Sequence, residues 1–165
     1  MKTKTNLKLP LKDSEKANLR KHRVRMVDIP NYAVDELEVL LDSTTERAGE
    51  ILALAEFQSV PSIGIRFAED LVFLGYHSLS ELRDKDGAEL TDDYEKKKGY
   101  QTDPCVEDQF RLVVDFAKTK NEEKRWWDFT EERKRFRLEH GYPADRPKEV
   151  WHEVLTLKTA QNKRD

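Results

Sequence analysis

A short turn of proline, serine and glycine is the stretch of this chain whose residue types and spacing best suit binding chemistry. Residues 60–64 read VPSIG, and Ile63, Phe67 and Leu71 then recur at the spacing of one helix face. The first backbone N–H groups of a helix have no partner within it, and they attract anions. The turn and the helix after it therefore predict a phosphate site. Its candidate residues are Ser62, Ile63, Gly64, Ile65 and Arg66, and its donors are the backbone N–H groups near Ile63 to Arg66 with the Arg66 guanidinium.

Two features near this turn oppose an anion. Ser62 stands where many DNA-binding hairpins have a glycine, so the turn is free of strain only if the φ angle of Ser62 stays negative. Glu69 and Asp70 follow about one helical turn later and repel a phosphate. The residues alone leave two interpretations: a phosphate site, or a turn used for packing and protein contact.

A second group of candidate phosphate ligands lies in the N-terminal stretch. Residues 1–26 carry nine Lys or Arg side chains against two acids, whereas residues 28–56 carry eight acids against one arginine. Lys21, Arg23 and Arg25 are the candidate nucleic-acid ligands here, because clustered cations gain free energy by releasing phosphate counterions. The alternatives are a solvated tail or a basic arm that folds back on the acidic stretch.

Helical periodicity and capping signals organise the chain around these candidates. We expect helices at about 34–41, 44–57, 86–98, 104–118 and 130–140. A hairpin helix reaches Leu74, a short helix carries Leu79 and Leu82, and a last amphipathic piece begins at Trp151. Ser43 is the predicted cap of the second helix, and Asp103 with Pro104 is the start of the most apolar one. No strand pattern of any length appears, so the predicted class is all-α.

The predicted architecture is a compact helical domain built on a helix-hairpin-helix with two hairpin-type units (a SAM-like arrangement). It divides the chain into a partly flexible basic arm (1–30), the helix-hairpin-helix domain (31–129) and a C-terminal helix and strap packed on that domain (130–165), with a frayed end.

Composition narrows the classes of function. The net charge is −3, so any attraction to nucleic acid must be local, and one cysteine cannot form an internal disulfide. We find no signal peptide and no membrane span, and expect a cytoplasmic protein. Four scattered histidines and the absence of phosphate-loop or dinucleotide motifs predict no enzyme, no catalytic residue, no metal and no cofactor.

Two further features allow more than one role. Cys105 lies near a helix start that can lower the pKa of its thiol, although a small buried packing residue is the interpretation we favour. Trp126 and Trp127 either form a platform on which bases stack or anchor the C-terminal segment to the core, and we favour an anchor for at least one of them.

Several separated blocks resemble one known family. They are VPSIG at 60–64, AEDLVFLG at 68–75, SLSEL at 78–82, DPC at 103–105 and the pair at 126–127. Together they resemble the helix-hairpin-helix family of small bacterial proteins labelled "pathogenicity locus", and more distantly the C-terminal domain of TfoX-type competence regulators. The resemblance implies DNA binding through the hairpin and no established enzymatic activity.

From residues and resemblance together we expect a non-enzymatic helix-hairpin-helix module. We expect it to bind DNA through backbone phosphates, without sequence specificity. We expect no membrane among its partners. The alternative is a protein–protein interaction adaptor in which the hairpin is structural and charged helices with exposed tryptophans contact a partner or a second copy.

Overall fold

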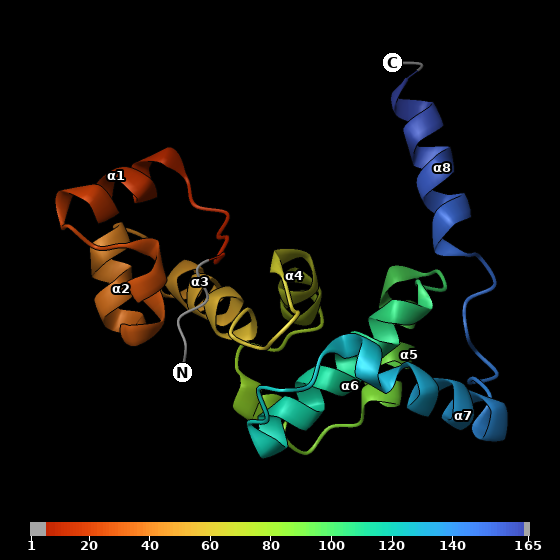
Figure 1. Cartoon of the computed structure of the whole chain (residues 1–165). Helices are drawn as coiled ribbons and strands as arrows, with labels where there is room; N and C mark the ends of the chain where they lie inside the picture. Colours follow the sequence, from red (N-terminus) through yellow and green to blue (C-terminus); the bar gives the residue numbers. More distant parts are fainter. Residues whose placement is uncertain (1–5, 164–165) are drawn as a thin grey trace.

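The computed structural model describes residues 6–163, and Figure 1 shows that this part of the chain is helical. The predicted all-α fold is confirmed. Within residues 6–163, strand-type pairing is limited to one parallel bridge between Gln101 and Val150. The elements are α1 (Asp13–Lys21), the 3-10 helix η1 (Met26–Asn31), α2 (Val34–Leu41), α3 (Thr45–Phe57), α4 (Ile65–Phe73), η2 (Leu79–Leu82), α5 (Gly87–Lys98), α6 (Pro104–Thr119), η3 (Trp126–Phe129), α7 (Thr130–His140) and α8 (Trp151–Asn162).

Helix boundaries follow local capping signals closely. Asp103 caps α6 and Pro104 is its first residue, as the sequence predicts. α2 has the predicted bounds. The predicted cap of α3 is wrong by one residue, because the hydroxyl of Thr44 rather than that of Ser43 accepts the Arg47 N–H, at 3.1 Å.

The core is centred on α6, the predicted central helix. Phe110 of α6 is fully buried, and its ring meets Phe67 of α4 edge-on at a centroid distance of 4.8 Å. Tyr94 of α5 packs against the same ring at 5.7 Å. α5 and α6 approach closely at Gly87, where an added Cβ would lie 2.8 Å from the Cα of Arg111. Gly87 therefore permits the contact between these two helices.

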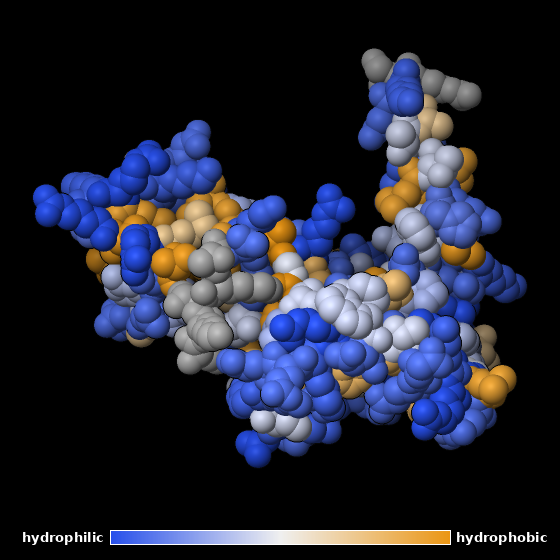
Figure 2. Space-filling view, in the orientation of Figure 1, coloured by the Kyte–Doolittle hydropathy of each residue, from blue (hydrophilic) through white to orange (hydrophobic). Residues whose placement is uncertain are grey.

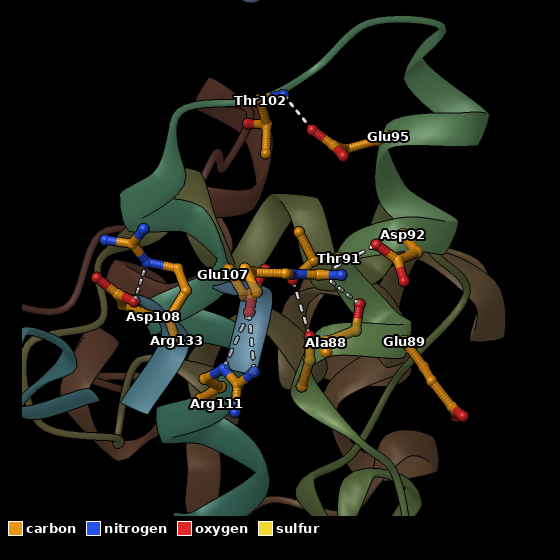
Figure 3. A network of polar contacts seen from close by, with 12 residues as sticks. Ala88, Glu89, Thr91, Asp92, Glu95, Thr102, Glu107, Asp108, Arg111 and Arg133 are labelled. Carbon is orange, nitrogen blue, oxygen red and sulfur yellow. Dashed lines mark hydrogen bonds and ion pairs between the residues drawn. The ribbon is translucent and has the colours of Figure 1, made fainter. Parts of the chain in front are cut away.

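Two carboxylates of α6 hold α7 in place (Figure 3). Asp108 is fully buried and accepts hydrogen bonds from Nε of Arg133 at 2.7 Å and from the Thr130 hydroxyl at 2.8 Å. Glu107, also buried, accepts from Nε of Arg137 at 2.8 Å. These two acids do not form a solvated face, because α7 covers them and supplies the opposite charge.

The same network reaches α5 and the segment after α7. Arg137 also donates to Asp92 of α5 at 2.9 Å. Further along α5, the buried Glu95 accepts from Arg146 at 2.9 Å. Arg146 belongs to the strap, residues 141–150, which runs from the end of α7 to α8. Paired charges thus join α5, α6, α7 and the strap.

The N-terminal stretch packs on α2 and α3. Leu9, Leu11 and Leu19 are buried in the core cluster. Glu15 of α1 is buried and pairs with Arg47 of α3 at 3.0 Å. Two lysines of the predicted basic arm, Lys2 and Lys4, lie outside the described residues. The last two residues of the chain also lie outside them.

The last helix, α8, extends away from the other helices (Figure 1, upper right). It contains no buried residue, and Leu155 and Leu157 are 46% and 66% exposed. In Figure 2 orange apolar side chains are visible along it, above a mostly blue, hydrophilic lower surface. Within the described part of the chain, no helix combines the length and apolarity needed to cross a membrane.

Candidate functional site

The turn between α3 and α4 is anchored by its apolar residues. Val60 and Ile63 are fully buried, and the N–H of Ile63 donates to the carbonyl of Val60 at 3.2 Å. Gly64, the next residue, is exposed and extended, with φ −105° and ψ −175°. Val60 and Ile63 therefore anchor the turn to the core and leave Gly64 at the surface.

Ser62 adopts the left-handed conformation, in which we expected its backbone to be strained. Its φ angle is +64°, which costs an L-residue about 1–2 kcal/mol. Its hydroxyl accepts a hydrogen bond from the backbone N–H of Trp126, at 3.1 Å. A hydrogen bond of this kind contributes about 1 kcal/mol, so it offsets much of the strain. Ser62 thus ties the turn to η3, which lies 64 residues later in the sequence.

The N-terminus of α4 has no side-chain cap. Gly64 is its N-cap residue and offers no side-chain acceptor, so the first N–H groups, which include those of Ile65 and Arg66, point outward without a helical partner. A Cβ built on Gly64 would meet no atom within 4 Å. Arg66 is exposed, with no ion pair to any described residue. Backbone donors and a free guanidinium therefore share one open surface.

An open cleft of about 710 Å³ lies over this surface. It brings together the five predicted residues of the turn with residues from the N-terminal segment, from the end of α3 and from α6. Its lining consists of Asn6, Lys8, Gln58, Ser62, Ile63, Gly64, Ile65, Arg66, Phe67 and Gln109.

Lys8 reaches the cleft because Gln58 holds its backbone. The Gln58 side chain accepts from the N–H of Lys8 at 3.1 Å and donates to its carbonyl at 2.7 Å. The Lys8 side chain itself is exposed. Lys8 was not predicted as a site residue, because the hydrogen bonds between Lys8 and Gln58 join residues 50 positions apart. Such a contact leaves no local pattern in the sequence.

Only one of the two predicted opposing acids remains free near the turn. Asp70 accepts a hydrogen bond from the hydroxyl of Tyr94 at 2.9 Å, which directs its carboxylate toward α5. Burial raises the pKa of Asp70, and the bond from Tyr94 counters part of that shift. Burial, followed by the neighbouring Asp70, likewise raises the pKa of Tyr94. Glu69 is exposed and is the acid that opposes an anion at the cleft.

The predicted ligands of the N-terminal stretch lie elsewhere. Lys21 ends α1, Arg23 follows with a positive φ of 56°, and Arg25 pairs with Asp28 at 2.9 Å. None of these three cations lines the cleft. The structure therefore separates the predicted site residues into a group at the turn and a second group near the end of α1.

Trp126 and Trp127 begin η3 directly beside the turn. Trp126 is half-buried and packs on the core cluster, which confirms the expected anchor. Trp127 is 55% exposed, and its ring meets that of Trp126 nearly at right angles, at a centroid distance of 5.3 Å.

Cys105 differs from both interpretations that the sequence suggested. The residue is exposed, so the buried packing role is wrong. Desolvation of its thiol and the carboxylate of Asp103 both raise the pKa of Cys105 instead of lowering it. Within residues 6–163, no three His, Cys, Asp or Glu side chains are grouped so as to hold a metal ion.

Comparison with known proteins gives two matches. The family described as "Pathogenicity locus" matches residues 50–135, which run from within α3 to within α7 and include the turn and η3. The mitomycin resistance protein McrB of Streptomyces lavendulae is 28% identical over 88 residues, which cover 53% of this chain and 83% of that protein. No solved structure matches the chain.

Proposed function

The chain belongs to the pathogenicity locus family, and we propose that it is a non-enzymatic module that binds DNA through backbone phosphates without reading base sequence. In this proposal α3, the turn and α4 act as a helix-hairpin-helix, with the arrangement of the C-terminal domain of TfoX-type competence regulators. The turn falls within the residues that match the family.

The open N-terminus of α4 carries the proposal. Its first N–H groups lack a side-chain cap, and Gly64 allows a phosphate to approach the backbone closely. Arg66 and Lys8 line the same cleft and supply positive charge. Contacts of this kind involve phosphate oxygens only, so they position a nucleic acid and carry no sequence information.

The residues that the structure describes leave the cleft accessible. The strap contacts α5 through Arg146 and through Asp145, which pairs with Lys96. It also bonds to Gln101, so its described contacts lie away from the turn. Tyr94 draws Asp70 toward α5, which leaves Glu69 as the nearby opposing charge. An open surface at a helix N-terminus, whose two charged lining residues are the cations Lys8 and Arg66, supports phosphate binding over a purely structural turn.

The test is a titration of fluorescent DNA with the wild type and with Arg66→Ala, at two salt concentrations. We expect the substitution to weaken binding about fivefold and to reduce the salt slope by about one. Arg83→Ala is the matched control, because Arg83 is an exposed arginine outside the cleft. Equal losses in both variants, or no loss in either, would refute a role for the turn.

A protein-interaction adaptor is the second candidate, favoured by one observation. α8 presents Leu155 and Leu157 to solvent on a helix with no buried residue. In that case a second copy covers these side chains, and the turn is structural. Concentration-dependent dimerisation in sedimentation equilibrium, together with no binding of DNA at low salt, would favour the adaptor.

A further inference from the structure

Trp127 is a large aromatic side chain that the fold leaves in solvent beside the turn. Two other aromatic residues of η3 face inward, since Phe129 is buried and Trp126 packs on the core. Trp127 itself is 55% exposed, and its ring packs nearly perpendicular to that of Trp126. The indole is therefore held by its neighbour while part of its surface stays open.

The position of Trp127 relative to the turn is fixed. The residue before it donates its N–H to the hydroxyl of Ser62 at 3.1 Å, and Ser62 lies next to Ile63 and Gly64 in the turn. One nucleotide that has its phosphate at the turn can therefore bring an adjacent base to the indole. The link from the turn to η3 is one hydrogen bond to Trp126, which packs on the core and directly precedes Trp127.

The charges beside Trp127 are compatible with this role. Arg125 is held by the carbonyls of Glu122 and Lys124, at 2.8 and 3.1 Å. Asp128, the nearest acid in the sequence, turns its carboxylate toward the N–H of Arg125, at 2.8 Å. Cations interleaved with aromatic side chains are typical of surfaces that bind single-stranded nucleic acid.

We infer that Trp127 stacks a base of single-stranded nucleic acid, whose neighbouring phosphate lies at the turn. The inference rests on the proposed phosphate binding and adds a class of ligand to it. A duplex keeps its bases stacked on one another, so a base reaches the indole only if it is first unstacked. Stacking on an aromatic face tolerates any base, which agrees with binding that does not depend on sequence.

The test compares three probes of equal length, about 15 nucleotides: oligothymidylate, an oligomer of abasic sites, and a duplex. The first two carry the same phosphates and differ in their bases. We expect the wild type to bind oligothymidylate about tenfold more tightly than the abasic oligomer, and more tightly than the duplex. Trp127→Ala should remove this difference while leaving the affinity for the abasic oligomer unchanged.

Trp151→Ala is the matched control, because Trp151 begins α8, which Figure 1 shows apart from α4 and the turn. The comparison within the wild type needs no variant, so it stands even if Trp127→Ala folds poorly. Equal affinity for oligothymidylate and the abasic oligomer overturns the stacking inference alone. A duplex bound as tightly as oligothymidylate also overturns it. Failure to bind any of the probes overturns the proposed function as well.

Discussion

The turn and the ionic network around α6 are two polar regions of the same fold. Charged side chains are buried and paired in the network, whereas at the turn a charged side chain is exposed to solvent. In the network, Asp108 is fully buried and meets Arg133 at 2.7 Å, and Glu107 meets Arg137 at 2.8 Å. At the turn, Arg66 is exposed, without an ion pair to any described residue.

The difference separates structural charges from charges available to a ligand. A buried carboxylate is tolerated only with a well-placed partner, so the network charges are committed to holding α7 and the strap. The exposed guanidinium of Arg66 is hydrated and needs no ion-pair partner to be stable, so it is available to bind a phosphate. Substitutions in the two regions should therefore affect different measurements.

Removing a partner from the network should give the largest effect. Arg133→Met leaves Asp108 buried with the Thr130 hydroxyl as its one hydrogen-bond partner among the described residues. We expect the free energy of unfolding to fall by about 3–5 kcal/mol, measured by urea denaturation. DNA affinity of the folded protein should not change.

The matched control is Lys134→Met, on the next residue of α7. Lys134 forms an exposed pair with Glu131 at 3.6 Å, so its loss should change stability by less than about 0.5 kcal/mol. If both variants lose similar stability, the network is not what holds α7.

Ser62 offers a smaller test, because its side chain and its backbone act in opposite directions. Ser62→Ala loses the hydroxyl that accepts from Trp126 and keeps the strained φ, so it should destabilise by about 1–2 kcal/mol. Ser62→Gly loses the same bond but relieves the strain, and should be close to neutral. Thermal unfolding of the two variants separates the terms; identical losses would contradict this account of the turn.

The smallest expected effect concerns Glu69, the free acid near the cleft. Glu69→Gln removes a like charge from the region of the phosphate and should raise DNA affinity about twofold at low salt. Glu89→Gln makes the same change in net charge on an exposed part of α5, away from the cleft. An equal gain in both would point to net charge instead of the turn.

Features set by neighbours in sequence were predictable. Asp103 and Pro104 start α6 as expected, and Gly75 and Gly141 follow α4 and α7 with positive φ angles of 98° and 68°. Such helix starts and ends depend on hydrogen bonds and backbone sterics within a few residues, so they can be predicted from the local sequence. The five residues predicted for the turn lie together because they are neighbours in sequence.

Features set by distant contacts were not predictable. The carboxylate of Asp108 looks the same in sequence whether it faces water or an arginine 25 residues later. The left-handed Ser62 depends on a bond to Trp126, far along the chain. Lys8 enters the cleft through Gln58. Helical periodicity reports which face of a helix is apolar, but it does not say which helix covers a polar face.

The most direct test of the central claim, that the turn binds backbone phosphate, is an amide NMR titration of this 19.4 kDa protein with a short oligonucleotide. The account predicts that the largest shift changes occur at residues 64–67, at the N-terminus of α4, with smaller ones near Lys8. Shift changes confined to residues 21–25 or to α8, with residues 64–67 unchanged at saturation, would contradict it.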